Sequence, residues 1–177
     1  MPARPIWPKG ALLAEATRPS RWRVFAPDTA GAIYGTIAAM AVIAGAAREP
    51  AHGKALGLTV ATLLVFWLAH VYAQTLSHHL RGERRPGWGA VVEAMAEERP
   101  LLEGPVPLLV VLILGELGVL EEHFAVRLAL WLGVTELVFW GILYSRRQHW
   151  SWLVALSAGA INGLFGLLIV ILEVIVH

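Results

Sequence analysis

The sequence predicts an all-α polytopic membrane protein with five transmembrane helices and one short cytoplasmic amphipathic helix. Hydrophobic residues make up 57% of the 177 residues and charged residues only 15%, whereas soluble domains are about a quarter charged. The mean hydropathy is +0.62. A soluble chain of this length could not bury so much apolar surface. The lipid bilayer is therefore the first partner that the sequence implies.

The chain begins with a Pro- and Arg-rich cytoplasmic tail at 1–28, followed by a membrane domain at 29–177. The first span is expected at 29–47, which is about 28 Å of helix and enough to cross a bilayer. Asp28 stands where an N-cap is expected.

The second span is expected at 55–77 and leads into a polar connection at about 80–104, which is long for a link between helices. Within it, Trp88–Arg99 predicts an amphipathic helix. The apolar face of this helix consists of Val91, Val92 and Met95, and the acidic face of Glu93, Glu97 and Glu98.

The last three spans are expected at 105–120, 125–144 and 152–176. A tight turn joins the first two of these, so an antiparallel hairpin would bring Glu116 and Arg127 together. We expect this pair to form a structural salt bridge.

Glycines with helical spacing mark two faces on which another helix could pack closely. They predict a homodimer or higher homo-oligomer, and the residues concerned are Gly31 and Gly35 in the first span and Gly159, Gly163 and Gly166 in the fifth.

The distribution of Lys and Arg predicts the orientation. Eleven lie on the side of the N-terminal tail and three on the other side. The positive-inside rule then puts the N-terminus in the cytoplasm and the C-terminus outside the cell membrane.

Polar side chains inside the spans suggest a buried seam. His70, Gln74 and His78 recur every four residues and so share one face of the second span. Counted from the helix ends, Glu136 and Asn162 lie at a depth similar to that of His70. Charged groups are costly in a bilayer and usually face protein, water or an ion.

Three functions fit such a seam. In the first, it moves protons or small cations, with His70 and Glu136 titrating and Gln74 and Asn162 relaying. In the second, it is a structural polar network in a non-transporting membrane scaffold or regulatory protein. The third is an intramembrane hydrolase, because Phe66 and His70 with Glu121–Glu122 and Arg127 resemble in part the CAAX-type intramembrane proteases, although in reversed order.

Cofactors and other partners are weakly indicated. The repulsion among Glu93, Glu97 and Glu98 would be offset by a bound divalent metal ion, although such a cluster is more often a solvated face. No other cofactor is indicated. There are no cysteines, so disulfides, thiolate metal sites and a cysteine nucleophile are excluded. No basic patch with interleaved aromatics favours nucleic acid.

The layout resembles that of the vacuolar iron transporter family. The features that carry the likeness are Asp28 before the first span, the LSHHLRGER stretch after the second, Glu93, Glu97 and Glu98 in the connection, and the Gly-rich fifth span. The resemblance implies a dimer that exchanges divalent metal for protons. The chain departs from the family in its shorter connection and in Pro27-Asp28-Thr29, where the family has Asn-Asp-Gly.

Overall fold

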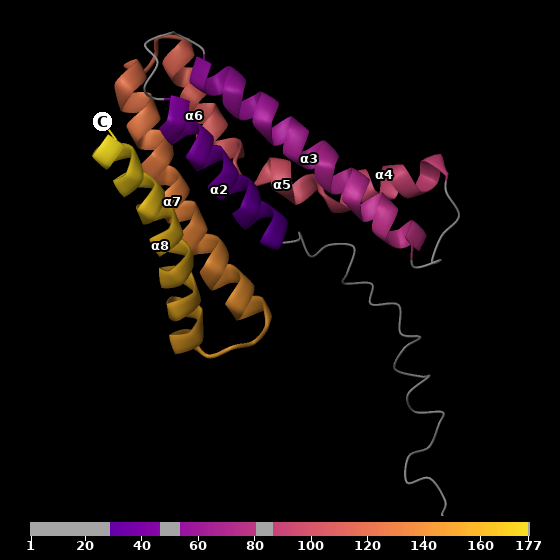
Figure 1. Ribbon diagram of the computed structural model, residues 1–177. Coiled ribbons are helices and arrows are strands. Elements are labelled where there is room, and N and C mark those ends of the chain that lie inside the picture. Colours follow the sequence, from indigo (N-terminus) through magenta and orange to yellow (C-terminus); the bar gives the residue numbers. More distant parts are fainter. Residues whose placement is uncertain (1–28, 47–53, 81–86, 177) are drawn as a thin grey trace, which may run out of the picture.

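The computed structural model describes residues 29–46, 54–80 and 87–176, and all regular structure in these ranges is helical (Figure 1). In chain order the helices are α2 (Thr29–Ala46), α3 (Lys54–Leu80), α4 (Trp88–Glu97), α5 (Arg99–Glu103), α6 (Val106–Glu116), α7 (Glu122–Arg147) and α8 (Trp152–Val176). The predicted all-α class is confirmed. The expectations for the tail at 1–28, Asp28 included, lie outside the described residues.

Three helices in the described ranges are long and apolar enough to cross a membrane: α3, α7 and α8. Helix α2 is apolar but shorter. Helix α6 has 11 residues and so measures about 17 Å, roughly half of the hydrocarbon thickness. The three long helices therefore support a membrane protein, while the crossings predicted for α2 and for the third span stay predictions.

The third predicted span ends earlier than expected, because the chain turns after Glu116. Gly118 has a φ of 72°, and the amide of Val119 donates to the carbonyl of Leu114. This pattern is a Schellman motif, which terminates a helix at a left-handed residue.

Helices α2 and α5 touch at backbone distance. A Cβ atom on Gly104, just after α5, would lie 2.5 Å from the carbonyl oxygen of Ala32, and one on Gly35 would overlap the backbone of Leu101. Only glycine allows so close an approach at these two positions. Gly31 also contacts α5, but a Cβ atom there would lie 3.4 Å or more from Pro100 and Leu101.

Helices α7 and α8 form an antiparallel hairpin, and glycines again allow the two helices to approach closely. A Cβ atom on Gly141 would lie 2.9 Å from the Cα of Gly159, and one on Gly163 would lie 2.5 Å from Val138. Gly166 meets Val134 and Leu137 one turn further on.

The glycine faces that were predicted to join subunits are thus occupied within a single chain. Gly31 and Gly35 are covered by α5, and the glycines of α8 are covered by α7. A homo-oligomer stays a prediction, and it would need a different surface.

The apolar face of α4 differs from the predicted one. The buried residue is Ala94, flanked by the partly buried Val91 and Met95, whereas Val92 is exposed. Helix α4 packs on α3, and that contact uses the Val91, Ala94 and Met95 side.

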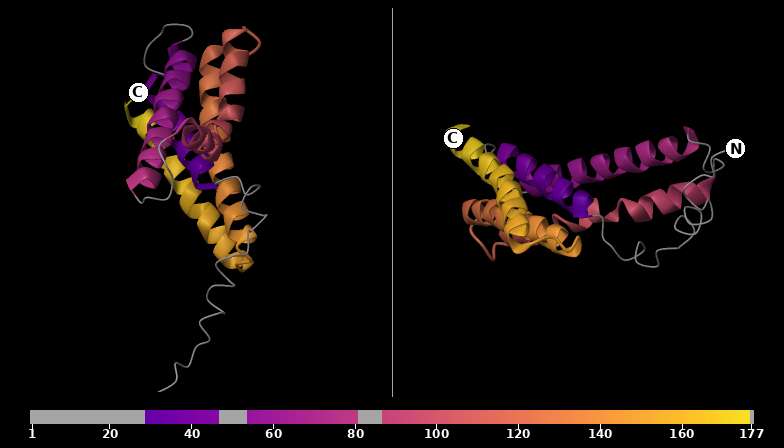
Figure 2. Two further views of the ribbon diagram at one scale, coloured as in Figure 1. Left: turned by 90° about the vertical axis from the view of Figure 1, so that its right-hand side faces the viewer. Right: turned by 90° about the horizontal axis from the view of Figure 1, so that it is seen from below.

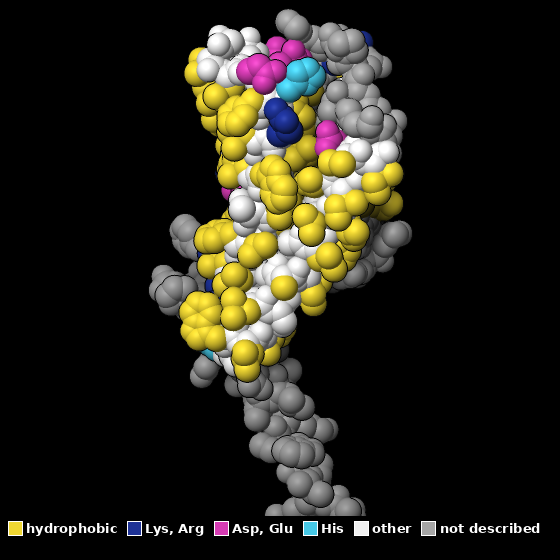
Figure 3. Space-filling view, turned by 90° about the vertical axis from the view of Figure 1, so that its left-hand side faces the viewer, with side chains coloured by type: hydrophobic (Ala, Val, Ile, Leu, Met, Phe, Trp, Pro, Cys, Tyr) yellow, Lys and Arg dark blue, Asp and Glu magenta, His cyan; other side chains and the backbone are white. Residues whose placement is uncertain are grey.

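Helices α3 and α4 extend away from the α7–α8 hairpin, as Figure 1 and the right-hand view of Figure 2 show. Val65, Leu68 and Tyr72 of α3 are exposed. The face formed by α7 and α8 is largely hydrophobic, with charged side chains gathered toward one end (Figure 3). Apolar surfaces of this extent suit lipid contact.

Candidate functional site

A contact layer fixes the relative heights of α2, α6 and α7. A Cβ atom on Gly133 of α7 would lie 2.5 Å from Sδ of Met40 in α2 and 3.3 Å from Cδ2 of Leu108 in α6. Met40 and Leu108 are fully buried. At this level the interior is closed by apolar side chains.

Three polar features lie about one helical turn beyond this layer. Helix α7 runs antiparallel to α2 and α6 (Figure 1). The positions three or four residues after Gly133 on α7 therefore lie at about the same height as the positions four residues before Met40 on α2 and four residues before Leu108. These positions are Glu136 on α7, Thr36 on α2 and Gly104–Pro105 at the start of α6. The direct contact of Gly104 is with Ala32, so the start of α6 lies about one turn before Thr36 along α2. We name this level the Glu136 layer.

The side chains of this layer hold buried polar atoms without hydrogen-bond partners in the described part of the chain. They are Oγ1 of Thr36, Oε2 of Glu136 and, one turn along α7, Nε1 of Trp140. Thr36 is 0% exposed. Leaving a buried polar group unpaired costs about 1–3 kcal/mol, so such atoms usually mark strain, function, or an unseen water or ion.

The N-terminus of α6 lies within about one helical turn of this level. Its N-cap is Pro105, and no side chain caps it. The first-turn amides of a helix carry a partial positive charge and favour nearby anions. Ala125, Gly133, Glu136 and Trp140 share one face of α7 by helical spacing, and α6 packs on that face through Gly115–Ala125 and Leu108–Gly133. Glu136 therefore lies on the side of α7 that faces α6, near the start of that helix.

Few other charges share this interior. Among the described helices that pack on α7, the titratable groups are Tyr34 on α2, Glu116 on α6 and Glu173 on α8. Tyr34 contacts His70 on the α3 side. Glu116 and Glu173 lie at the ends of their helices far from this level. Glu103 and Arg99 of α5 are exposed.

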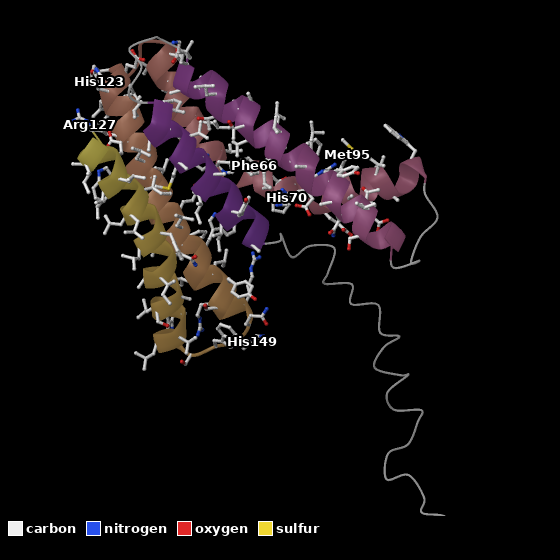
Figure 4. All side chains as sticks on the ribbon, viewed as in Figure 1. Phe66, His70, Met95, His123, Arg127 and His149 are labelled. Carbon is white, nitrogen blue, oxygen red and sulfur yellow. The ribbon has the colours of Figure 1, made fainter. Side chains whose placement is uncertain are left out.

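The structure does not bring His70 and Glu136 together. His70 pairs through Nδ1 with the carbonyl of Phe66 at 2.8 Å, and its ring lies 5.4 Å from that of Tyr34. Tyr34 and Met40 are six residues apart, so they face different sides of α2. Helix α2 therefore lies between His70, which Figure 4 shows on α3, and the α7 carboxylate.

The side chain of Gln74 contacts α4, which is the helix predicted within the polar connection. Its Nε2 donates to Oε2 of Glu97 in α4 across 3.2 Å. Gln74 thus belongs with the surface of α4 and is not part of the Glu136 layer.

Asn162 packs on a different side of α7 from Glu136. A Cβ atom on Gly141 would lie 2.5 Å from Nδ2 of Asn162. Five residues separate Glu136 from Gly141, which is about 140° around a helix. The predicted seam is therefore divided into three places.

The hairpin that was expected to bring Glu116 and Arg127 together is present between α6 and α7. Gly115 of α6 contacts Ala125 of α7, and a Cβ atom on Gly115 would lie 2.8 Å from the Cβ of Ala125. Arg127 donates from Nε to the carbonyl of His123 at 3.3 Å. The ion pair itself stays a prediction.

The other acidic residues singled out from the sequence have structural surroundings. No three His, Asp or Glu side chains in the described ranges come together as metal ligands, so Glu93, Glu97 and Glu98 do not form such a set. Glu121 accepts hydrogen bonds from the amides of His123 and Phe124 and caps α7. Figure 4 places His123 and Arg127 at the start of α7, far from Phe66 and His70 on α3.

Thr36 and Trp140 were not recognised from the sequence. Trp140 follows Glu136 by four residues, which does place both on one face. Thr36 gives no signal, because it is one small polar residue in a helix of small residues. Its role depends on what packs against it.

No protein-family model, no curated protein and no solved structure matches the chain. The resemblance to the vacuolar iron transporter family stays a prediction.

Proposed function

We propose that the protein is an integral membrane protein that moves protons or small cations, and that Glu136 takes up and releases the ion. The observation that supports this most strongly is Oε2 of Glu136, which is buried near the middle of a membrane-length helix and has no hydrogen-bond partner among the described residues. A carboxylate inside a membrane costs free energy, so one that is present there usually serves a function.

The proposed topology keeps the five predicted crossings. Helices α2, α3, α7 and α8 cross, and α5 with α6 forms an interrupted crossing whose break lies at the Glu136 layer. Interrupted helices commonly place their half-helix ends at ion sites in transporters. The excess of Lys and Arg on one side supports a cytoplasmic N-terminus in the cell membrane.

The proposed path is narrower than the predicted seam. It centres on Glu136 and Thr36, with Trp140 beside them. His70, Gln74 and Asn162 have local contacts of their own and are proposed as structural groups.

A non-transporting membrane scaffold is the second candidate. It is favoured by those same local contacts, because most polar groups of the predicted seam already have a packing role. It leaves the unpaired oxygen of Glu136 unexplained.

Flux into liposomes tests the proposal. The purified protein is reconstituted, and proton and cation entry are followed with dyes, for the unmodified chain and for Glu136→Gln. We expect flux that Glu136→Gln abolishes while helix content and thermal unfolding are retained. The matched control is Glu116→Gln, which removes an exposed carboxylate of a neighbouring helix and should leave flux unchanged.

Two results would contradict the proposal. One is the absence of any proton or cation flux from the well-folded chain. The other is flux that Glu136→Gln leaves intact. The first would favour the scaffold, and the second would mean that the ion path does not use Glu136.

The topology has its own measurement. The chain has no cysteine, so single cysteines can be introduced at each connection and labelled from one side of sealed vesicles. We expect the α7–α8 turn to be labelled from the cytoplasmic side and the α6–α7 turn from the outside. Labelling of both turns from the same side would rule out the proposed crossings.

A further inference from the structure

The polar groups at or near the level of Glu136 differ in kind from those that hold metal ions. Trp140 offers only an indole N–H, the first turn of α6 offers amide N–H groups, and Thr36 offers a hydroxyl. Apart from the oxygens of Glu136 and Thr36, these are hydrogen-bond donors. Donors stabilise a negative carboxylate and repel a bare cation.

Metal ions need more oxygen or nitrogen ligands than this layer provides. Calcium takes six to eight oxygens and magnesium a near-octahedral set. Across the described residues no three His, Asp or Glu side chains converge, and Asn162 faces another side of α7. A proton needs a single carboxylate oxygen.

The charges nearby also favour exchange of a proton. No titratable side chain of α2, α6 or α8 faces Glu136. Tyr34 lies at a similar height but contacts His70 on the α3 side, Glu116 and Glu173 lie at the far ends of their helices, and Arg99 and Glu103 of α5 are exposed. Glu136 therefore has no fixed counter-ion among these helices. Its Oε2 has no hydrogen-bond partner in the described part of the chain, so no donor there stabilises a charge on that oxygen, and the neutral form needs only a proton.

We propose that the ion taken up by Glu136 is the proton, and that the Glu136 layer does not bind metal cations. This rests on the proposed function for the movement of the ion, but the chemistry of uptake can be tested without transport.

A hydrophobic carbodiimide supplies the test. Dicyclohexylcarbodiimide enters lipid and adds to a protonated carboxyl group: the acid proton passes to nitrogen, the carboxylate oxygen bonds to the central carbon, and the adduct rearranges to an N-acylurea without a leaving group. The reconstituted protein is treated at acidic and at alkaline pH, with and without Na⁺, K⁺, Mg²⁺ or Mn²⁺. Adducts are then located by mass spectrometry.

We expect an adduct on Glu136 that is abundant at acidic pH, is reduced at alkaline pH and is unchanged by any of the four cations. Glu136→Gln should lose this adduct and no other. Protection by one of the cations, or no adduct on Glu136 at acidic pH, would overturn the proposal.

The outcomes separate this inference from the proposed function. Labelling as expected without any flux would support proton uptake and contradict transport. Cation protection together with a cation flux that depends on Glu136 would support transport and contradict the proton as its ion.

Discussion

Gln74 of α3 donates a hydrogen bond to Glu97 of α4, with 3.2 Å between Nε2 and Oε2. The bond joins the end of a membrane-length helix to the amphipathic helix that follows it. It explains two features that seemed unrelated in the sequence, namely a polar residue in an apolar span and a glutamate in an acidic cluster. Both serve to dock α4 on α3.

A double-mutant cycle should detect this docking. Unfolding in detergent is measured for Gln74→Leu, for Glu97→Ala and for the double variant. Because the bond is exposed, we expect a coupling energy of about 0.5–1 kcal/mol. Glu93→Ala on the same helix is the control and should show no coupling to Gln74. Additive effects of Gln74→Leu and Glu97→Ala would mean that the bond adds no stability.

Thr36→Val should leave stability unchanged or raise it by up to about 1 kcal/mol, because the hydroxyl it removes is buried without a partner. Thr59→Val is a matched control. Thr59 is equally buried, but its Oγ1 donates to the carbonyl of Ala55 at 2.7 Å. We expect Thr59→Val to lose about 1 kcal/mol. Equal losses in the two variants, measured by thermal unfolding, would show that Thr36 has a partner.

Gly141→Ala should separate α7 from α8. The added Cβ would lie 2.8 Å from the carbonyl oxygen of Ala158 and 2.9 Å from the Cα of Gly159. Since backbone cannot move aside cheaply, we expect a loss of about 1–3 kcal/mol. Gly57→Ala in α3 is the control: nothing lies within 4 Å of the added Cβ, so the better helix propensity should add about 0.5–1 kcal/mol. A neutral Gly141→Ala would contradict the close hairpin.

His149→Gly should stabilise the protein. His149 has a φ of 58°, and the amide of Trp150 donates to the carbonyl of Ser145, as in a Schellman motif. A left-handed residue other than glycine costs about 1 kcal/mol, which the change should recover as a higher midpoint of thermal unfolding.

Gly118→Ala is the reciprocal experiment at the end of α6. Gly118 has a φ of 72° and nothing lies within 4 Å of an added Cβ, so only backbone strain changes. We expect a loss of about 1 kcal/mol. If both changes lowered stability, the explanation by backbone conformation would be wrong.

The class and the bounds of most helices could be predicted, because both depend on local features. An apolar run of the right length predicts a helix of that length, and Pro100, Pro105 and the polar turns mark where helices stop. The predicted first span at 29–47 and fifth span at 152–176 agree with α2 and α8 to within one residue. The third span was predicted too long, because Gly118 was not recognised as a helix terminator.

By itself, the sequence determined that the chain is helical, that it is apolar enough for lipid, and how deep each polar residue lies along its helix, since depth follows from counting residues at a fixed rise. Only the tertiary structure decided which helices are neighbours and which way each one is turned. Those choices depend on contacts between residues far apart in the chain, such as Gly35 with Leu101 and Gly133 with Met40. For that reason His70 and Glu136, at a similar predicted depth, lie on opposite sides of α2, while the unremarked Thr36 shares the level of Glu136.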